Sequence, residues 1–142
     1  MKQTYLLSLL TLTAASALAQ SAAPASGPAV TGNLGFTSDY VFRGISQTAG
    51  KLAVQGGFDV DFKNGLTAGV WASNVSTAFG NLEVDLYANY GFKVGQVDLS
   101  VGYIDYTYST ANNGGEANVS AAYKGVTLKV SKGVNGTLSD YY

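Results

Sequence analysis

Two pairs of carboxylates are the residues of this chain whose type and spacing could do chemistry. Asp59 and Asp61 form one pair, and Glu83 and Asp85 form the other. If each pair lies on a β-strand, both carboxylates project from the same face, with their Cα atoms roughly 6–7 Å apart. That spacing is compatible with glycoside hydrolysis, which uses two facing acids, or with a calcium ion held by oxygen ligands.

The composition argues against both kinds of chemistry. The 142 residues include no histidine and no cysteine, which removes the usual zinc ligands, thiolate nucleophiles and histidine acid–base catalysis. Basic side chains can balance the acids across a polar lumen, namely Arg43, Lys51, Lys124 and Lys129. We therefore expect no enzyme, no metal site and no cofactor. The net charge of −1 also provides no basic field, so nucleic acid is not expected as a partner.

The pattern that must position these acids is an alternation of apolar and polar residues with a period of two. The alternation predicts seven strands, at about 30–43, 51–62, 66–75, 81–92, 97–108, 116–123 and 126–132. Tight turns are expected at 63–65, 93–96 and 124–125, and longer loops at 44–50, 76–80 and 109–115. Short and long connections therefore alternate along the chain.

The turn after Phe62 determines which face Trp71 occupies. A three-residue loop ending in a left-handed Gly65 keeps the apolar residues on one face and sets Trp71 opposite Gly57. A two-residue Asn64-Gly65 turn is the alternative, and it would send Trp71 to the apolar face. We favour the three-residue loop because it preserves the faces of both strands.

Residues 1–19 have the parts of a secretory signal peptide. Lys2 supplies the positive start, an apolar run follows, and Ala17-Leu18-Ala19 fits the cleavage motif. Residues 20–29 are predicted to be a flexible leader, and residues 30–142 a β-barrel domain. The protein is therefore expected to be exported. A membrane-bound form would have to cross the bilayer as a closed barrel, because no later segment is apolar over the length of a spanning helix.

Alternation alone does not state whether the apolar face is buried in a soluble sandwich or turned to lipid. The alternating turn lengths, the long strands and the aromatics near strand ends all favour lipid. The expected fold class is all-β, an antiparallel up-and-down meander that forms a transmembrane β-barrel in the outer membrane. A soluble periplasmic or secreted β-sandwich, or a lipocalin-like binding module, is the alternative.

Seven strands leave closure of the barrel open. Bacterial barrels normally have an even number of strands, and a closed sheet exposes no edge to lipid. We expect the barrel domain to be incomplete at its C-terminus, as the front part of a longer barrel or a truncated gene product. Closure with eight short strands, or by association with other chains, is the alternative, so a homo-oligomer stays open.

Four stretches also carry a family resemblance. "GNLGFTSDYVFRGISQT" (32–48), "QGGFD" (55–59), "WASNV" (71–75) and "GNLEVDLYANYGF" (80–92) resemble exported proteobacterial proteins labelled TorF-type porins. The resemblance fades after residue 92. It implies an outer-membrane barrel that conducts small solutes.

The resulting functional hypothesis is a porin-like barrel in outer-membrane lipid that passes small hydrophilic solutes through a polar lumen. The residues expected to line the lumen are Asp39, Arg43, Gln55, Asp59, Asp61, Glu83, Asp85 and Lys129. The aromatics expected at the membrane interface are Tyr40, Phe42, Phe62, Tyr90, Phe92, Tyr103 and Tyr123. Register places Arg43 near Lys51, so its counter-charge is expected from across the lumen or from the strand on its other side.

Overall fold

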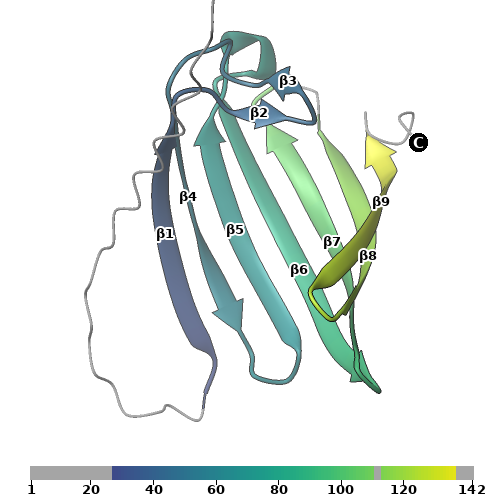
Figure 1. Ribbon diagram of the computed structural model, residues 1–142. Helices are drawn as coiled ribbons and strands as arrows, with labels where there is room; N and C mark the ends of the chain where they lie inside the picture. Colours follow the sequence, from purple (N-terminus) through teal and green to yellow (C-terminus); the bar gives the residue numbers. More distant parts are fainter. Residues whose placement is uncertain (1–26, 111–112, 137–142) are drawn as a thin grey trace, which may run out of the picture.

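The computed structural model describes residues 27–110 and 113–136, and most of these residues form one seven-stranded antiparallel sheet (Figure 1). The sheet order is β1-β4-β5-β6-β7-β8-β9, so each strand lies beside its neighbours in the chain. Its strands are β1 (Ala29–Thr37), β4 (Ala53–Asp61), β5 (Leu66–Asn74), β6 (Leu82–Val94), β7 (Val97–Tyr108), β8 (Gly114–Tyr123) and β9 (Val126–Gly136). The predicted all-β, up-and-down antiparallel meander is confirmed.

Three small elements lie outside this sheet. β2 (Val41–Phe42) and β3 (Ile45–Ser46) pair with each other as a separate two-stranded hairpin. A single turn of 3-10 helix, η1 (Thr77–Phe79), lies between β5 and β6. Across the described ranges, no helix has the length and apolar character needed to span a bilayer. The predicted signal peptide (1–19), most of the leader (20–29) and the last residues of the predicted barrel domain lie outside the described residues.

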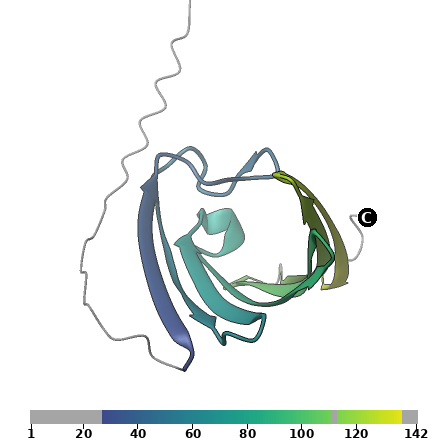
Figure 2. The ribbon, with the colours of Figure 1, turned by 60° about the horizontal axis from the view of Figure 1, so that its bottom comes forward.

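The seven strands curl without closing into a barrel (Figure 2). Among the described residues, the two edge strands β1 and β9 form no ladder with each other. In a seven-stranded antiparallel meander the first and last strands run in the same direction, so β1 and β9 have the wrong polarity for antiparallel closure. The described residues therefore form no closed barrel, and the transmembrane barrel expected from the sequence stays a prediction.

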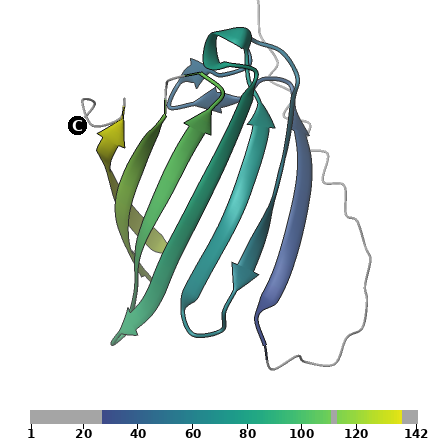
Figure 3. The same cartoon turned by 180° about the vertical axis from the view of Figure 1, so that it is seen from behind.

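Figures 1 and 3 show the tight turns at one end of the sheet and β2, β3 and η1 at the other. The β4–β5 turn is the predicted three-residue loop, because the Phe62 N–H donates to the Leu66 carbonyl over 3.0 Å. Gly65 has φ +93° and is left-handed. Trp71 lies directly opposite Gly57, as predicted. A Cβ on Gly57 would collide with the carbonyl oxygen of the facing strand, so glycine is required there.

Several boundaries differ from the prediction. The first strand ends at Thr37 instead of residue 43, because the chain bends away from the sheet there. The last strand continues to Gly136 instead of residue 132, and the loop expected at 109–115 is shorter because β8 begins at Gly114. The turn expected at 93–96 tightens to two residues, with Val94 opposite Val97. The tighter turn preserves the face of each strand it joins because it keeps the period of two. The β8–β9 ladder shifts its register between Gly115 and Glu116, so the extension to Gly136 includes a β-bulge.

The large apolar side chains of the sheet are exposed and several polar ones are buried, which is the reverse of the arrangement in a soluble domain. On the outer face, Leu128 is 71% exposed and Leu34 69% exposed. On the concave face, Glu83 is 1% exposed and Glu116 2% exposed. The described residues therefore bury three acids, Glu83, Asp85 and Glu116, and present large apolar side chains outward.

Candidate functional site

Residues 38–50, here called the crossing segment, leave β1 and fold over the concave face (Figures 1 and 2). The segment holds its own shape. The Asp39 carboxylate accepts hydrogen bonds from the Ser46 hydroxyl (2.5 Å) and the Thr48 hydroxyl (2.8 Å). The Gln47 N–H donates to the Tyr40 carbonyl over 2.6 Å. Because the hydroxyl donors favour the charged carboxylate, the pKa of Asp39 lies below its usual value.

Tyr40 and Phe42 point toward the concave face, which corrects their prediction as membrane-interface aromatics. The Tyr40 ring packs edge-on against Trp71 of β5, with ring centroids 5.4 Å apart. The Phe42 ring lies 5.8 Å from that of Tyr106 on β7. Burial raises the pKa of the Tyr40 hydroxyl, and the nearby Glu83 raises it further. The prediction was wrong because it extended the first strand through both residues, whereas the chain turns inward after Thr37.

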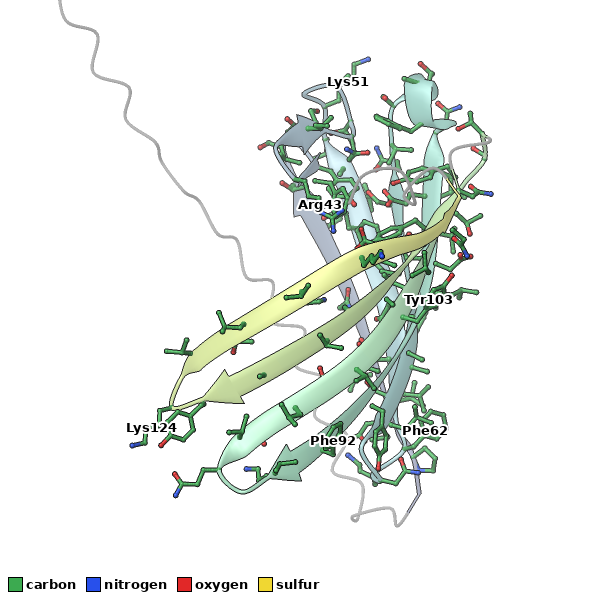
Figure 4. The ribbon with its side chains drawn as sticks, turned by 90° about the vertical axis from the view of Figure 1, so that its right-hand side faces the viewer. Arg43, Lys51, Phe62, Phe92, Tyr103 and Lys124 are labelled. Carbon is green, nitrogen blue, oxygen red and sulfur yellow. The ribbon has the colours of Figure 1, made fainter. Side chains whose placement is uncertain are left out.

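Arg43, labelled in Figure 4, has its counter-charge on β8, across the concave face. Its guanidinium donates two hydrogen bonds to the Glu116 carboxylate of β8, at 2.7 Å and 2.9 Å. The Tyr106 hydroxyl donates to the same carboxylate over 3.4 Å. The Glu116 side chain is 2% exposed and the Arg43 side chain 42% exposed. A two-bond fork of this kind is directional, so it holds the tip of the crossing segment in one place.

Glu83 and Asp85 lie side by side beneath the crossing segment. The Glu83 Oε1 accepts from the Tyr108 hydroxyl (2.7 Å) and from the Tyr40 hydroxyl (3.5 Å). Asp85 lies between Trp71 of β5 and Tyr106 of β7 in the cross-strand register. One oxygen of each acid, Glu83 Oε2 and Asp85 Oδ1, is buried without a hydrogen-bond partner. Within the described ranges, no group of three or more acidic side chains is arranged to hold a metal ion.

The other acids of the predicted lumen set lie nearer the tight turns. The Asp59 carboxylate accepts from the Tyr87 hydroxyl over 2.5 Å. Asp61 ends β4 and binds the Lys63 ammonium over 2.7 Å at the exposed turn. The concave face thus carries Asp59, whereas Asp61 sits at its rim.

Gln55 and Lys129 share the polar parity of these acids. Gln55 faces Ser73 across the β4–β5 ladder. Lys129 borders a recess of about 200 Å³ on the β6–β9 side of the concave face. Other polar residues that line this recess are Tyr87, Asn89, Tyr106, Glu116, Asn118 and Ser131. A lumen-lining role for the set as a whole stays a prediction.

The remaining predicted aromatics lie on the outer face, most of them near the tight turns. Figure 4 shows Phe62 and Phe92 at that end and Tyr103 further toward the other. The Phe92 ring stacks on that of Tyr90, with centroids 6.0 Å apart. The Tyr123 ring lies 5.2 Å from the Lys124 ammonium at the β8–β9 turn. Their role at a membrane interface also stays a prediction.

The candidate set from the sequence lacked the residues that complete the site. The sequence does indicate Glu116, because it lies on the polar face of a strand whose apolar face carries Ala117 and Val119. The other missed residues are aromatic side chains on the polar face, namely Trp71, Tyr106 and Tyr108. Their contacts come from neighbouring strands and from the crossing segment, so the tertiary structure is needed to identify them.

The family comparison matches most of the chain. The sequence pattern of a family described as "Bacterial protein of unknown function (Gcw_chp)" matches residues 21–140. No curated protein and no solved structure matches.

Proposed function

Since this chain belongs to the Gcw_chp family, whose function is unknown, we propose its function from the fold: a porin-like wall of a transmembrane β-barrel in the bacterial outer membrane. Small hydrophilic solutes would pass by diffusion along its polar concave face. No reaction is required, only a polar lumen with charged groups that bias which solutes enter.

The observation that carries this proposal is the reversed exposure of the two faces. Burying one leucine- or phenylalanine-sized side chain is worth about 1.5–3 kcal/mol in water, so a soluble domain would gain by covering such a face. Here it is left outward over β1, β4, β6, β8 and β9. A hydrocarbon environment removes the cost of that arrangement, because apolar side chains then face acyl chains.

Strand length supports the same conclusion. A tilted strand needs about 9–11 residues to cross a bilayer. The seven strands of the sheet run from 9 to 13 residues. The predicted signal peptide and the resemblance to TorF-type porins point to the same location, the outer membrane.

The direction of the two edge strands limits how the barrel can be completed. Lipid cannot satisfy the free backbone groups of β1 and β9, so both edges need partners. A second copy inserted with the same orientation would present strands of the same direction, and its pairing would be parallel. We propose instead that closure uses an odd number of additional strands, from this polypeptide or from a different one. The strands that pair with β1 and β9 would run opposite to them.

Fractionation followed by electrical recording tests this function. The complete sequence, expressed in a Gram-negative host, should appear in the outer-membrane fraction and require detergent for extraction. The extracted protein should produce discrete conductance steps in a planar bilayer. Recovery of the mature protein in the soluble periplasmic fraction without detergent would instead favour the soluble binding module.

A further inference from the structure

We propose that the crossing segment is the constriction of the pore and sets the size limit of permeant solutes, with the Arg43–Glu116 ion pair holding it in place. This inference rests on the proposed function. It assigns the permeant class as water, inorganic ions and neutral solutes of about glycerol size, with disaccharides excluded.

The first argument is the reach of the crossing segment over the concave face. Tyr40 touches Trp71 on β5 and Glu83 on β6. Phe42 touches Tyr106 on β7, and Arg43 then binds β8. The segment therefore contacts four successive strands on their polar side. Figure 2 shows its ribbon passing over the concave side of the sheet. A solute moving along that face must pass these side chains.

The second argument is that the segment is built as a unit. The hydrogen bonds of Asp39 to Ser46 and Thr48 close it on itself. At its far end, the Ser76 N–H donates to the Gln47 carbonyl over 2.7 Å, which ties it to the β5–β6 connection. A segment with its own internal bonds can change position against the wall without unfolding.

The third argument is the placement of the ion pair at the tip. Arg43 has φ +49° and Gly44 φ +84°, so Arg43 stands at the turn between β2 and β3. Its fork to the buried Glu116 crosses from the tip to the far wall. Removing either partner leaves the tip with the Phe42–Tyr106 ring contact, which is less directional.

The fourth argument is the recess beside Glu116, the residue on β8 that binds Arg43 at the tip of the segment. The recess bounded by Tyr106, Glu116 and Lys129 holds about 200 Å³. At the liquid share of about 30 Å³ per water, this is space for roughly seven water molecules. A solute of about glycerol size fits that space, whereas a disaccharide does not.

The test compares two variants with a matched control. Glu116→Gln removes the buried charge, and Arg43→Gln removes the exposed partner, so the second variant covers the case in which the first fails to fold. Asp98→Asn breaks the exposed Lys93–Asp98 pair at the tight-turn end and serves as the control. All are made in the full chain, extracted in detergent from the outer membrane together with any partner that closes the barrel, and reconstituted in lipid vesicles.

Two readouts are measured on each protein. Trp71 is the single tryptophan of the chain and packs against Tyr40, so its quenching by acrylamide reports the position of the crossing segment. Vesicle swelling in glycerol, glucose and sucrose reports the size limit. We expect both Arg43→Gln and Glu116→Gln to raise the quenching constant at least about twofold and to admit sucrose. The wild type and Asp98→Asn should admit glycerol at most.

Two results would overturn the inference in distinguishable ways. If wild-type vesicles swell and the two variants keep the same size limit and the same Trp71 quenching, the segment is not the constriction, and the porin function stands. If neither wild type nor variants swell in any solute or conduct ions, the proposed function fails and the constriction fails with it.

Discussion

An arginine placed in the middle of the outer face should destabilise the protein far more than an arginine near its rim. Val119 lies in the middle of β8, is 54% exposed, and faces Val101 and Val130 on the neighbouring strands. Val126 is 66% exposed and begins β9 directly after the turn. Both changes are Val→Arg on the same outer face, so they differ mainly in depth.

The magnitude follows from the position along the strand. Val119 is four residues from the end of β8 at Tyr123, or about 13 Å along the strand at about 3.3 Å per residue. With a tilt near 40°, that is about 10 Å of depth, close to the middle of an apolar band about 25 Å tall. Arginine there should cost about 2–4 kcal/mol, against about 0–1 kcal/mol at Val126.

The assay is equilibrium unfolding of the refolded protein in lipid vesicles, followed by Trp71 fluorescence in denaturant. The two costs differ by at least about 1 kcal/mol, and about 1.4 kcal/mol is a factor of ten. Val119→Arg should therefore lower the folded-to-unfolded ratio at least about fivefold relative to Val126→Arg. If both variants unfold within about 0.5 kcal/mol of the wild type, as ordinary surface substitutions do, the outer face does not meet lipid and the reasoning is refuted.

Two further predictions concern the wall and the crossing segment. Gly57→Ala should reduce the free energy of unfolding by about 1–3 kcal/mol, because the added methyl group collides with backbone. Gly35→Ala is the control, because a methyl group there meets nothing closer than 4.0 Å and should be near neutral. Denaturant unfolding of both variants measures the difference in stability. Asp39 has a pKa lowered by the hydroxyls of Ser46 and Thr48, so its contribution is present above pH 3.8 and is lost as the pH falls below that value. Asp39→Asn should therefore show a smaller rise in tryptophan quenching than the wild type on acidification below pH 3.8, and identical curves would contradict this assignment.

The alternation of apolar and polar residues was sufficient to predict the seven-stranded sheet. It predicted seven strands, their order and the face of each, because a single-residue slip would move every apolar side chain to the polar side. The register at Trp71 and Gly57 followed from the same constraint. Boundaries near Thr37 and Gly136 could not be read in this way, because where a strand ends depends on whether a neighbour remains to pair with it.

The sequence by itself determined which residues share a face, since alternation is a local property of an extended chain. Only the tertiary structure decided that "SDYVFRGIS" is an inward hairpin and that Arg43 binds Glu116, 73 residues away. Contacts of that separation depend on how the whole sheet curls, and no local pattern encodes the curl. Of the two acid pairs first considered for chemistry, Glu83 and Asp85 thus lie beneath the crossing segment, whereas Asp59 and Asp61 lie nearer the tight turns.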